Sequence, residues 1–176
     1  LLSLVGSEMC IRDRSMNAGA FEREIMPYVY SLDLLDENGT IYTLKNNEIP
    51  YSYRTSDIDK KSIIISVKLL KQTINFDMNH LNLLNQKRKT SQPINQLSWG
   101  CIFKNPSGEH AAKLIDSAQL KGSRAGGIYI SHKHSNYFIN DGSGTYRDFL
   151  VLLKRVKEVI ISKFNIKLDE EVILLK

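Results

Sequence analysis

The stretch MPYVYSLDLLDENGTIYTLKN, residues 26–46, decides how the first part of this chain folds. Two segments rich in β-branched and aromatic residues flank Asn38-Gly39, and such a pair between such segments is the strongest short signal for a β-hairpin. A continuous β-branched segment follows, SIIISVKLL at residues 62–70, and this pattern is typical of a strand buried in the core. The first part is therefore predicted to be an antiparallel sheet.

The second part mixes helical and strand patterns. Helices are expected over residues 77–93, ended by Pro93, over residues 109–122, ended by Gly122, and from Thr145, whose capping box is completed by Asp148. Strands are expected within residues 126–131, 136–140 and 167–176. The predicted fold class is α+β.

Composition narrows the possible functions. The 176 residues suffice for one domain or two small ones, and the net charge of +5 fits an anionic substrate as well as nucleic acid. The two cysteines, Cys10 and Cys101, lie far apart, which excludes a disulfide framework and a four-ligand zinc site. We therefore expect no metal and a reducing, cytoplasmic setting. No apolar run approaches the roughly 18 residues of a membrane span.

The first residues, LLSLVGSEMCIRDR, continue no helical or strand period. They resemble translated sequencing adapter, so we expect residues 1–14 to be a scar outside the fold and Cys10 to have no function. A natural terminus is the alternative.

Three clusters of polar residues could have a catalytic or binding function, and each could also have a purely structural role. Arg54, in YSYRTS, is either an exposed loop residue or a guanidinium fork for a carboxylate or enolate. Cys101, in GCIFKNPSG, is a nucleophile, a metal ligand, a proton donor or a small buried apolar residue, and Lys104 and Asn105 could donate to phosphate. Glu171 could be a surface carboxylate at the start of a strand.

The basic run Lys87, Arg88 and Lys89 is either a solvated helix end, where cations favour the dipole, or a phosphate-facing surface.

Five segments, taken in this order, resemble the family of UDP-N-acetylenolpyruvoylglucosamine reductases, also called UDP-N-acetylmuramate dehydrogenases. They are MNAGAFEREI (16–25), YSYRTS (51–56), QPINQLSWGCIFKNPSGEHAAKLIDSAQLKG (92–122), AGGIYISHKHSNYFIN (125–140) and LDEEV (168–172). The central segment is the most specific, and the spacing resembles the shorter form of the family.

The resemblance implies an FAD-dependent enzyme that uses NADPH to reduce UDP-N-acetylglucosamine enolpyruvate to UDP-N-acetylmuramate in peptidoglycan precursor synthesis. It implies that residues 15–76 are the end of an FAD-binding α+β domain and residues 77–176 an α+β substrate-binding domain. We expect a cytoplasmic monomer that binds a UDP-sugar, with no nucleic acid or membrane partner. Most of the family's FAD domain has no counterpart here, so we expect the chain to be a fragment that binds FAD weakly and is inactive alone.

Carried over residue by residue, the resemblance makes Arg54 and Glu171 the groups that stabilise the enolate-like intermediate. Lys104 and Asn105 match residues near the substrate diphosphate, and His134 stands with them, its role left open. The first matching segment, which would lie against the flavin, contains Asn17, Gly19 and Ala20.

Cys101 departs from the family, which usually has serine there as the proton donor. A thiol, with an ordinary pKa of about 8.5, is a stronger acid than a hydroxyl and can quench a carbanion from the same position. Cys101 is therefore predicted to be the proton donor, and a site that has lost its donor is the alternative.

Two other functions compete. One is a non-catalytic module that binds a UDP-sugar, and the other is a small RNA-binding domain that uses Lys87, Arg88 and Lys89 but lacks clustered aromatic residues.

Overall fold

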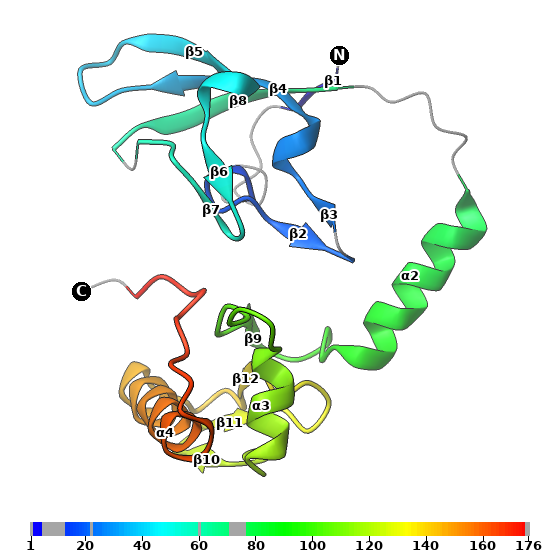
Figure 1. Cartoon of the computed structure of the whole chain (residues 1–176), viewed down its shortest axis with the longest axis vertical. Helices are drawn as coiled ribbons and strands as arrows, with labels where there is room; N and C mark the ends of the chain where they lie inside the picture. Colours follow the sequence, from blue (N-terminus) through cyan, green and yellow to red (C-terminus); the bar gives the residue numbers. More distant parts are fainter. Residues whose placement is uncertain (1, 5–12, 22, 60, 71–76, 175–176) are drawn as a thin grey trace. The chain divides into compact units, whose positions relative to one another are not determined.

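The computed structural model describes residues 2–4, 13–21, 23–59, 61–70 and 77–174 (Figure 1). The chain divides into two compact units, Leu1–Asn75 and Phe76–Lys176, and each has a hydrophobic core of its own. Mixed helices and strands confirm the α+β class.

The first unit is built on a four-stranded antiparallel sheet of order β1-β8-β4-β5 (Figure 1). The strands are β1 (Leu2–Leu4), β4 (Val29–Leu35), β5 (Ile41–Lys45) and β8 (Ile63–Leu69). The turn at Asn38-Gly39 joins β4 to β5, and Gly39 has the positive φ of +81° that the turn requires. The predicted hairpin is confirmed.

Strand β8 is confirmed as a strand, but it is not buried throughout. Ile64 and Val67 lie in the core, whereas Ile63 is 57% exposed. Successive side chains of a strand point to opposite faces, and an antiparallel sheet needs only one packed face. The expectation of continuous burial is therefore wrong.

Smaller elements complete the first unit. They are β2 (Gly19–Ala20), β3 (Arg23–Glu24), the 3₁₀ turns η1 (Met26–Tyr28) and η2 (Asn46–Glu48), β6 (Tyr51–Ser52) and β7 (Thr55–Ser56). Strand β2 pairs with β3, and β6 pairs with β7.

Two described pieces of residues 1–14, which we expected to lie outside the fold, contact the first unit. Leu2–Leu4 pairs as β1 with β8, and the Ser56 hydroxyl donates to the Arg14 carbonyl at 3.2 Å. The edge of a sheet can accept any extended backbone, so this pairing needs no special sequence. The origin of the stretch as a scar stays a prediction.

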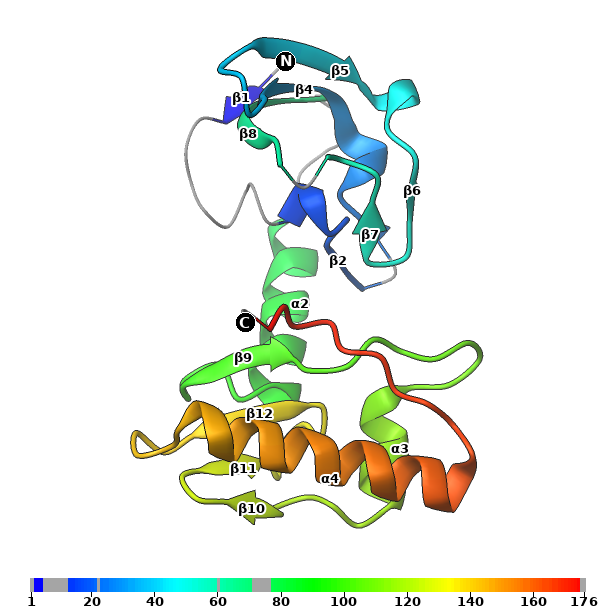
Figure 2. The ribbon, with the colours of Figure 1, turned by 90° about the vertical axis from the view of Figure 1, so that its left-hand side faces the viewer.

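The second unit has a four-stranded antiparallel sheet of order β10-β11-β12-β9. The strands are β9 (Ser98–Cys101), β10 (Arg124–Ala125), β11 (Ile128–Ile130) and β12 (Tyr137–Asn140). Helix α4 (Tyr146–Phe164) lies along one face of this sheet (Figure 2). Its predicted capping box is confirmed, and its buried residues are Phe149, Leu152, Leu153, Val156 and Ile160.

Helix α2 (Met78–Ser91) begins at the cap of Asp77 and ends before Pro93, as predicted. None of its residues is buried. Helix α3 (Ala111–Ser117) is shorter than expected, since the chain leaves the helix at Gln119, which has a φ of +61°, and not at Gly122.

The predicted C-terminal strand is wrong for the described residues 167–174, which form a single bridge between Phe103 and Glu170. Glu171 N donates to Ile102 O at 2.8 Å, and Lys104 N donates to Asp169 O at 2.9 Å. The ladder extends no further because Ile102 N is already bonded to Asn136 O, and because Pro106 has no N–H.

Candidate functional site

Strand β9 holds Cys101 at the edge of the second unit's sheet. Ser98 pairs with Ile139 and Cys101 pairs with Tyr137, so both Trp99 and Gly100 lie opposite one residue, Phe138. This is a β-bulge, and Gly100 takes the φ of +78° that a glycine accepts without strain.

The bulge sends neighbouring side chains to opposite faces of the sheet. Trp99 packs against Phe149 of α4, with ring centroids 5.0 Å apart. Cross-strand partners share a face, and Tyr137 alternates with the buried Phe138, so Cys101 lies with Tyr137 on the face opposite α4. The candidate acid is thus separated from the apolar core.

Tyr137 and His134 form the immediate surroundings of Cys101. All three side chains are half-buried. Tyr137 and Cys101 are directly opposite each other in the β9–β12 pair, and the Cys101 side chain acts on the pKa of the Tyr137 phenol. The His134 ring meets the Tyr137 ring nearly edge-on, with centroids 4.7 Å apart.

Burial shifts the pKa values of both Tyr137 and His134, and in both cases it favours the uncharged form. It raises the pKa of Tyr137 to about 12, with the nearby Cys101 side chain as the second cause. It also lowers the pKa of His134 below 6.5. Near neutral pH the phenol is therefore a hydrogen-bond donor, and the imidazole is uncharged.

The C-terminal segment brings Glu171 to this cluster. Its backbone bond to Ile102 places it beside the residue that follows Cys101. The charge of Glu171 is also among the causes that raise the pKa of Tyr137, after burial and the Cys101 side chain. An ion pair of 2.7 Å between Lys157 and Glu170 holds the same segment against α4.

Asn136 is buried and fixes the backbone after Cys101. Its Nδ2 donates to Phe103 O at 2.8 Å, and its Oδ1 accepts from Phe103 N at 3.0 Å. Sequence reasoning missed Asn136 and Tyr137, since both were assigned to a strand. The polar pair directly before an apolar strand was the available signal.

Besides its predicted role at the substrate diphosphate, Asn105 caps the start of α3. Its Oδ1 accepts a hydrogen bond of 3.0 Å from Ala111 N at the start of α3. Lys104, the preceding residue, is half-buried and follows the bridge at Phe103. Their contact with a substrate diphosphate stays a prediction.

The basic run at the end of α2 lies near the same cluster. The positive charge of Arg88 acts on the Tyr137 phenol and lowers its pKa, against the larger effect of burial. The Lys133 ammonium donates to the carbonyl of Lys89. A phosphate-facing role for this run stays a prediction.

Arg54 belongs to the first unit, in the turn between β6 and β7. Its side chain is 17% exposed, so the exposed-loop interpretation is wrong. The guanidinium donates to Gly19 O at 2.7 Å, lies 4.0 Å from the Glu24 carboxylate and covers the Tyr53 ring at 4.9 Å. Its φ of +55° is unusual for a residue other than glycine, and such positions cluster at functional sites.

The predicted flavin-facing segment surrounds this arginine. Asn17 is fully buried and donates to Glu24 Oε2 at 2.8 Å and to Ser52 O at 2.9 Å, so its amide shapes the turn. A Cβ on Gly19 would meet the Arg54 guanidinium at 2.8 Å, and Ala20 is exposed. Contact of Asn17, Gly19 and Ala20 with a flavin stays a prediction.

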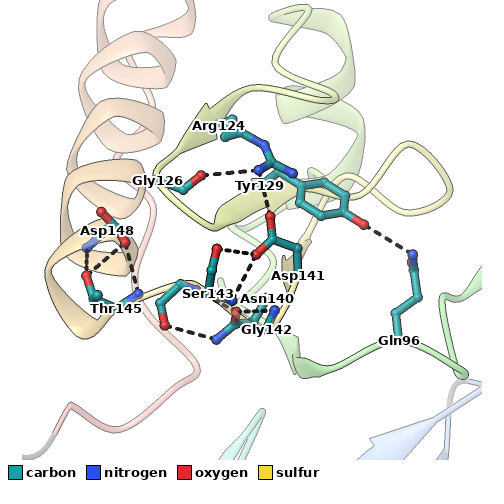
Figure 3. A network of polar contacts seen from close by, with 11 residues as sticks. Gln96, Arg124, Gly126, Tyr129, Asn140, Asp141, Gly142, Ser143, Thr145 and Asp148 are labelled. Atoms are coloured by element: carbon teal, nitrogen blue, oxygen red, sulfur yellow. Dashed lines mark hydrogen bonds and ion pairs between the residues drawn. The ribbon is translucent and has the colours of Figure 1, made fainter.

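A second polar cluster of the second unit is structural (Figure 3). Arg124 pairs with Asp141 at 2.7 Å and covers the Tyr129 ring at 5.1 Å, and Gln96 Nε2 donates to the Tyr129 hydroxyl at 3.2 Å. Hydrogen bonds from Ser143, then Arg124, lower the pKa of Asp141 to about 2. These groups bond mainly to one another and hold the loop that precedes α4.

Among the described residues, no helix has the length and apolarity to cross a membrane. No three of their histidine, cysteine or acidic side chains gather in a way that could hold a metal ion.

Comparison with known proteins gives a consistent result. The family model of the UDP-N-acetylenolpyruvoylglucosamine reductase C-terminal domain matches residues 92–175. UDP-N-acetylenolpyruvoylglucosamine reductase of Fusobacterium nucleatum is 35% identical over 161 residues, which cover 92% of this chain and 57% of the relative. The Caldanaerobacter subterraneus protein of the same name is 38% identical over 160 residues, with coverage of 89% and 53%.

A solved structure, UDP-N-acetylenolpyruvylglucosamine reductase from Thermus caldophilus, matches with a TM-score of 0.80 and 31% identity, over 92% of this chain and 58% of that chain. The chain spans about half the length of the curated relatives it matches.

Proposed function

We propose that this chain is part of a member of the family of UDP-N-acetylenolpyruvoylglucosamine reductases, because it resembles that family's C-terminal domain and its members, and that it takes part in reducing UDP-N-acetylglucosamine enolpyruvate to UDP-N-acetylmuramate. The product is a precursor of peptidoglycan. The observation that carries the proposal is the half-buried Cys101, with Tyr137 directly opposite it and Glu171 bonded through its backbone to the next residue, Ile102.

Cys101 performs the proton transfer. When a hydride adds to one carbon of the enol ether double bond, the neighbouring carbon gains carbanion character. The S–H bond of Cys101 breaks, its proton forms the new C–H bond, and a thiolate remains. General acid catalysis of this kind contributes about 10²- to 10⁴-fold in rate.

Arg54 and Glu171 act on the enolate-like intermediate. Gly19 O and the Glu24 carboxylate hold the Arg54 guanidinium in place before any substrate binds, and a pre-oriented fork suits a carboxylate or enolate oxygen. Glu171 is assigned to the same intermediate by its place in the C-terminal motif.

FAD, reduced by NADPH, would supply the hydride. The backbone of Gly19 and Ala20 would lie against the flavin, with Asn17 fixing the turn before them. The first unit is thus assigned to the cofactor, and the second to the substrate. A thiol acid needs a reducing compartment, which favours the cytoplasm.

Substrate binding is assigned to the second unit. Lys104 and Asn105 would hold the diphosphate, and the uncharged His134 would lie beside them as a neutral hydrogen-bonding group. The protein would work as a monomer on a UDP-sugar.

The test joins residues 16–176 behind the preceding segment of the Fusobacterium nucleatum relative and follows NADPH oxidation that depends on the UDP-sugar. We expect turnover, a fall of about 10²- to 10⁴-fold in Cys101→Ala, and substantial activity in the matched control Cys101→Ser, which restores a hydroxyl acid. A fusion that holds FAD and binds the UDP-sugar but oxidises no NADPH would contradict the proposal and favour a non-catalytic binding module.

A further inference from the structure

We propose that Tyr137 is a positioning residue for the proton transfer: its hydroxyl orients the Cys101 sulfur and stabilises the thiolate that the transfer leaves behind. The inference rests on the proposed function, since it gives Tyr137 a task in the step assigned to Cys101.

The geometry comes from the β9 bulge. Cys101 and Tyr137 are directly opposite each other in the β9–β12 pair, and opposite residues of an antiparallel pair have Cβ atoms about 4.5 to 5.5 Å apart. Both side chains lie on the face opposite α4, within reach of each other across the strand pair. Without the bulge, strict alternation from Trp99 would turn position 101 toward the core.

The surroundings hold the Tyr137 ring in one orientation. The His134 ring contacts it edge-on with centroids 4.7 Å apart, and His134 Nδ1 accepts a hydrogen bond of 3.3 Å from Asn136 N. Asn136 is itself bonded twice to Phe103. The phenol is therefore fixed by the same backbone that fixes the segment after Cys101.

The order in which the Cys101 thiol and the Tyr137 phenol lose their protons decides which of the two donates the hydrogen bond. An ordinary thiol ionises near pH 8.5, whereas the pKa of Tyr137 is raised to about 12. The phenol therefore keeps its proton when the thiol loses its own, and it can donate to the thiolate. A hydrogen bond to the charged form favours that form, which strengthens Cys101 as an acid.

Other charged groups act on the pair from each neighbouring element. Glu171 of the C-terminal segment disfavours negative charge beside the phenol, and Arg88 of α2 favours it. His134 is uncharged near neutral pH, because burial and, to a smaller extent, the charge of Lys121 lower its pKa. These groups stay the same when Tyr137 alone is changed, so a single substitution isolates the phenol.

The test is a thiol titration of the 176-residue chain. In a Cys10→Ser background Cys101 is the single thiol, because the chain has two cysteines. The rate of alkylation by iodoacetamide is measured against pH with and without Tyr137→Phe. We expect the midpoint of the curve to move to higher pH and the rate near neutral pH to fall about tenfold, as for the loss of a hydrogen bond to a charged group.

Tyr129→Phe is the matched control, because its hydroxyl bonds to Gln96 in the other cluster. Its curve should have the midpoint of the parent. A purely structural role of Tyr137 would change the plateau rate and leave the midpoint in place, so an unchanged midpoint in a folded Tyr137→Phe chain overturns the proposal.

A reciprocal measurement decides the question if Tyr137→Phe does not fold. Cys101→Ala removes the partner and leaves the phenol, so one tyrosine should ionise at lower pH in a titration of phenolate absorbance. An identical tyrosine titration in Cys101→Ala also overturns the proposal. Neither measurement needs flavin, NADPH or substrate, so a loss of turnover in the fusion would contradict the proposed function and leave this result intact.

Discussion

Asn136 connects two backbone segments through one buried side chain, and its two bonds to Phe103 lie directly beside the Cys101 cluster. We expect Asn136→Ala to lower the free energy of unfolding by about 3 kcal/mol, because it leaves a buried donor and a buried acceptor without partners. Urea unfolding followed by Trp99 fluorescence measures this, since Trp99 is the single tryptophan of the chain. The exposed Asn95→Ala should change the value by less than about 0.5 kcal/mol, and equal effects of the two substitutions would contradict the assignment.

Asp141 links stability to acid pH. Its folded pKa, about 2, lies below the ordinary value of 3.8, so its contribution is fully present above pH 3.8 and is lost as the pH falls through about 2. We expect Asp141→Asn to unfold at a lower temperature than the parent near neutral pH and to approach it near pH 2. A difference in melting temperature that stays constant over this range would refute the linkage.

Individual residues of the site were only partly predictable from sequence. The order of the sequence motifs identified Arg54 and Cys101 as candidates, because residue types and their local spacing can be read directly from the sequence. The partner of Cys101 was not visible, since Tyr137 lies 36 positions away and meets it only through strand register. The burial of Arg54 likewise depends on contacts with Gly19 and Glu24, which the sequence around it does not reveal.

Strand β9 depends on the bulge at Gly100. A Cβ there would meet no atom within 4 Å, so the penalty of Gly100→Ala is conformational and not steric. We expect the substitution to reduce stability by about 1 to 2 kcal/mol, the energy of placing a residue other than glycine at positive φ. Unfolding followed by Trp99 fluorescence measures it, and Ser98→Ala in the same strand should have a smaller effect. An equally stable Gly100→Ala chain would show that the bulge does not need glycine.

Elements specified by neighbouring residues were predicted well. The hairpin at Asn38-Gly39 and the capping box of α4 are encoded within a few residues, and both are confirmed. The C-terminal strand failed because its pairing depends on distant hydrogen bonds, with Ile102 N already bonded to Asn136 O. Local pattern gives an element its type, and competition for backbone partners decides whether it forms.

At the scale of the whole molecule, each unit carries its own core. The second unit's core includes Phe103, Phe138 and Leu152, and the first unit's includes Leu32 and Val67. We expect residues 77–176 expressed alone to fold, because their buried apolar side chains come from within that segment. Trp99 fluorescence and its unfolding midpoint should match those of the full chain. A separate segment with exposed apolar surface and no cooperative unfolding would contradict this expectation.

The bulge in β9 also has a consequence for how related sequences can diverge. Trp99 and Cys101 are two positions apart, yet one packs on Phe149 and the other meets Tyr137 on the opposite face. Selection for packing therefore acts on one position and selection for chemistry on the other. In an alignment of homologues, position 99 should covary with 149 and position 101 with 137, so that the two pairs drift independently within a single short strand.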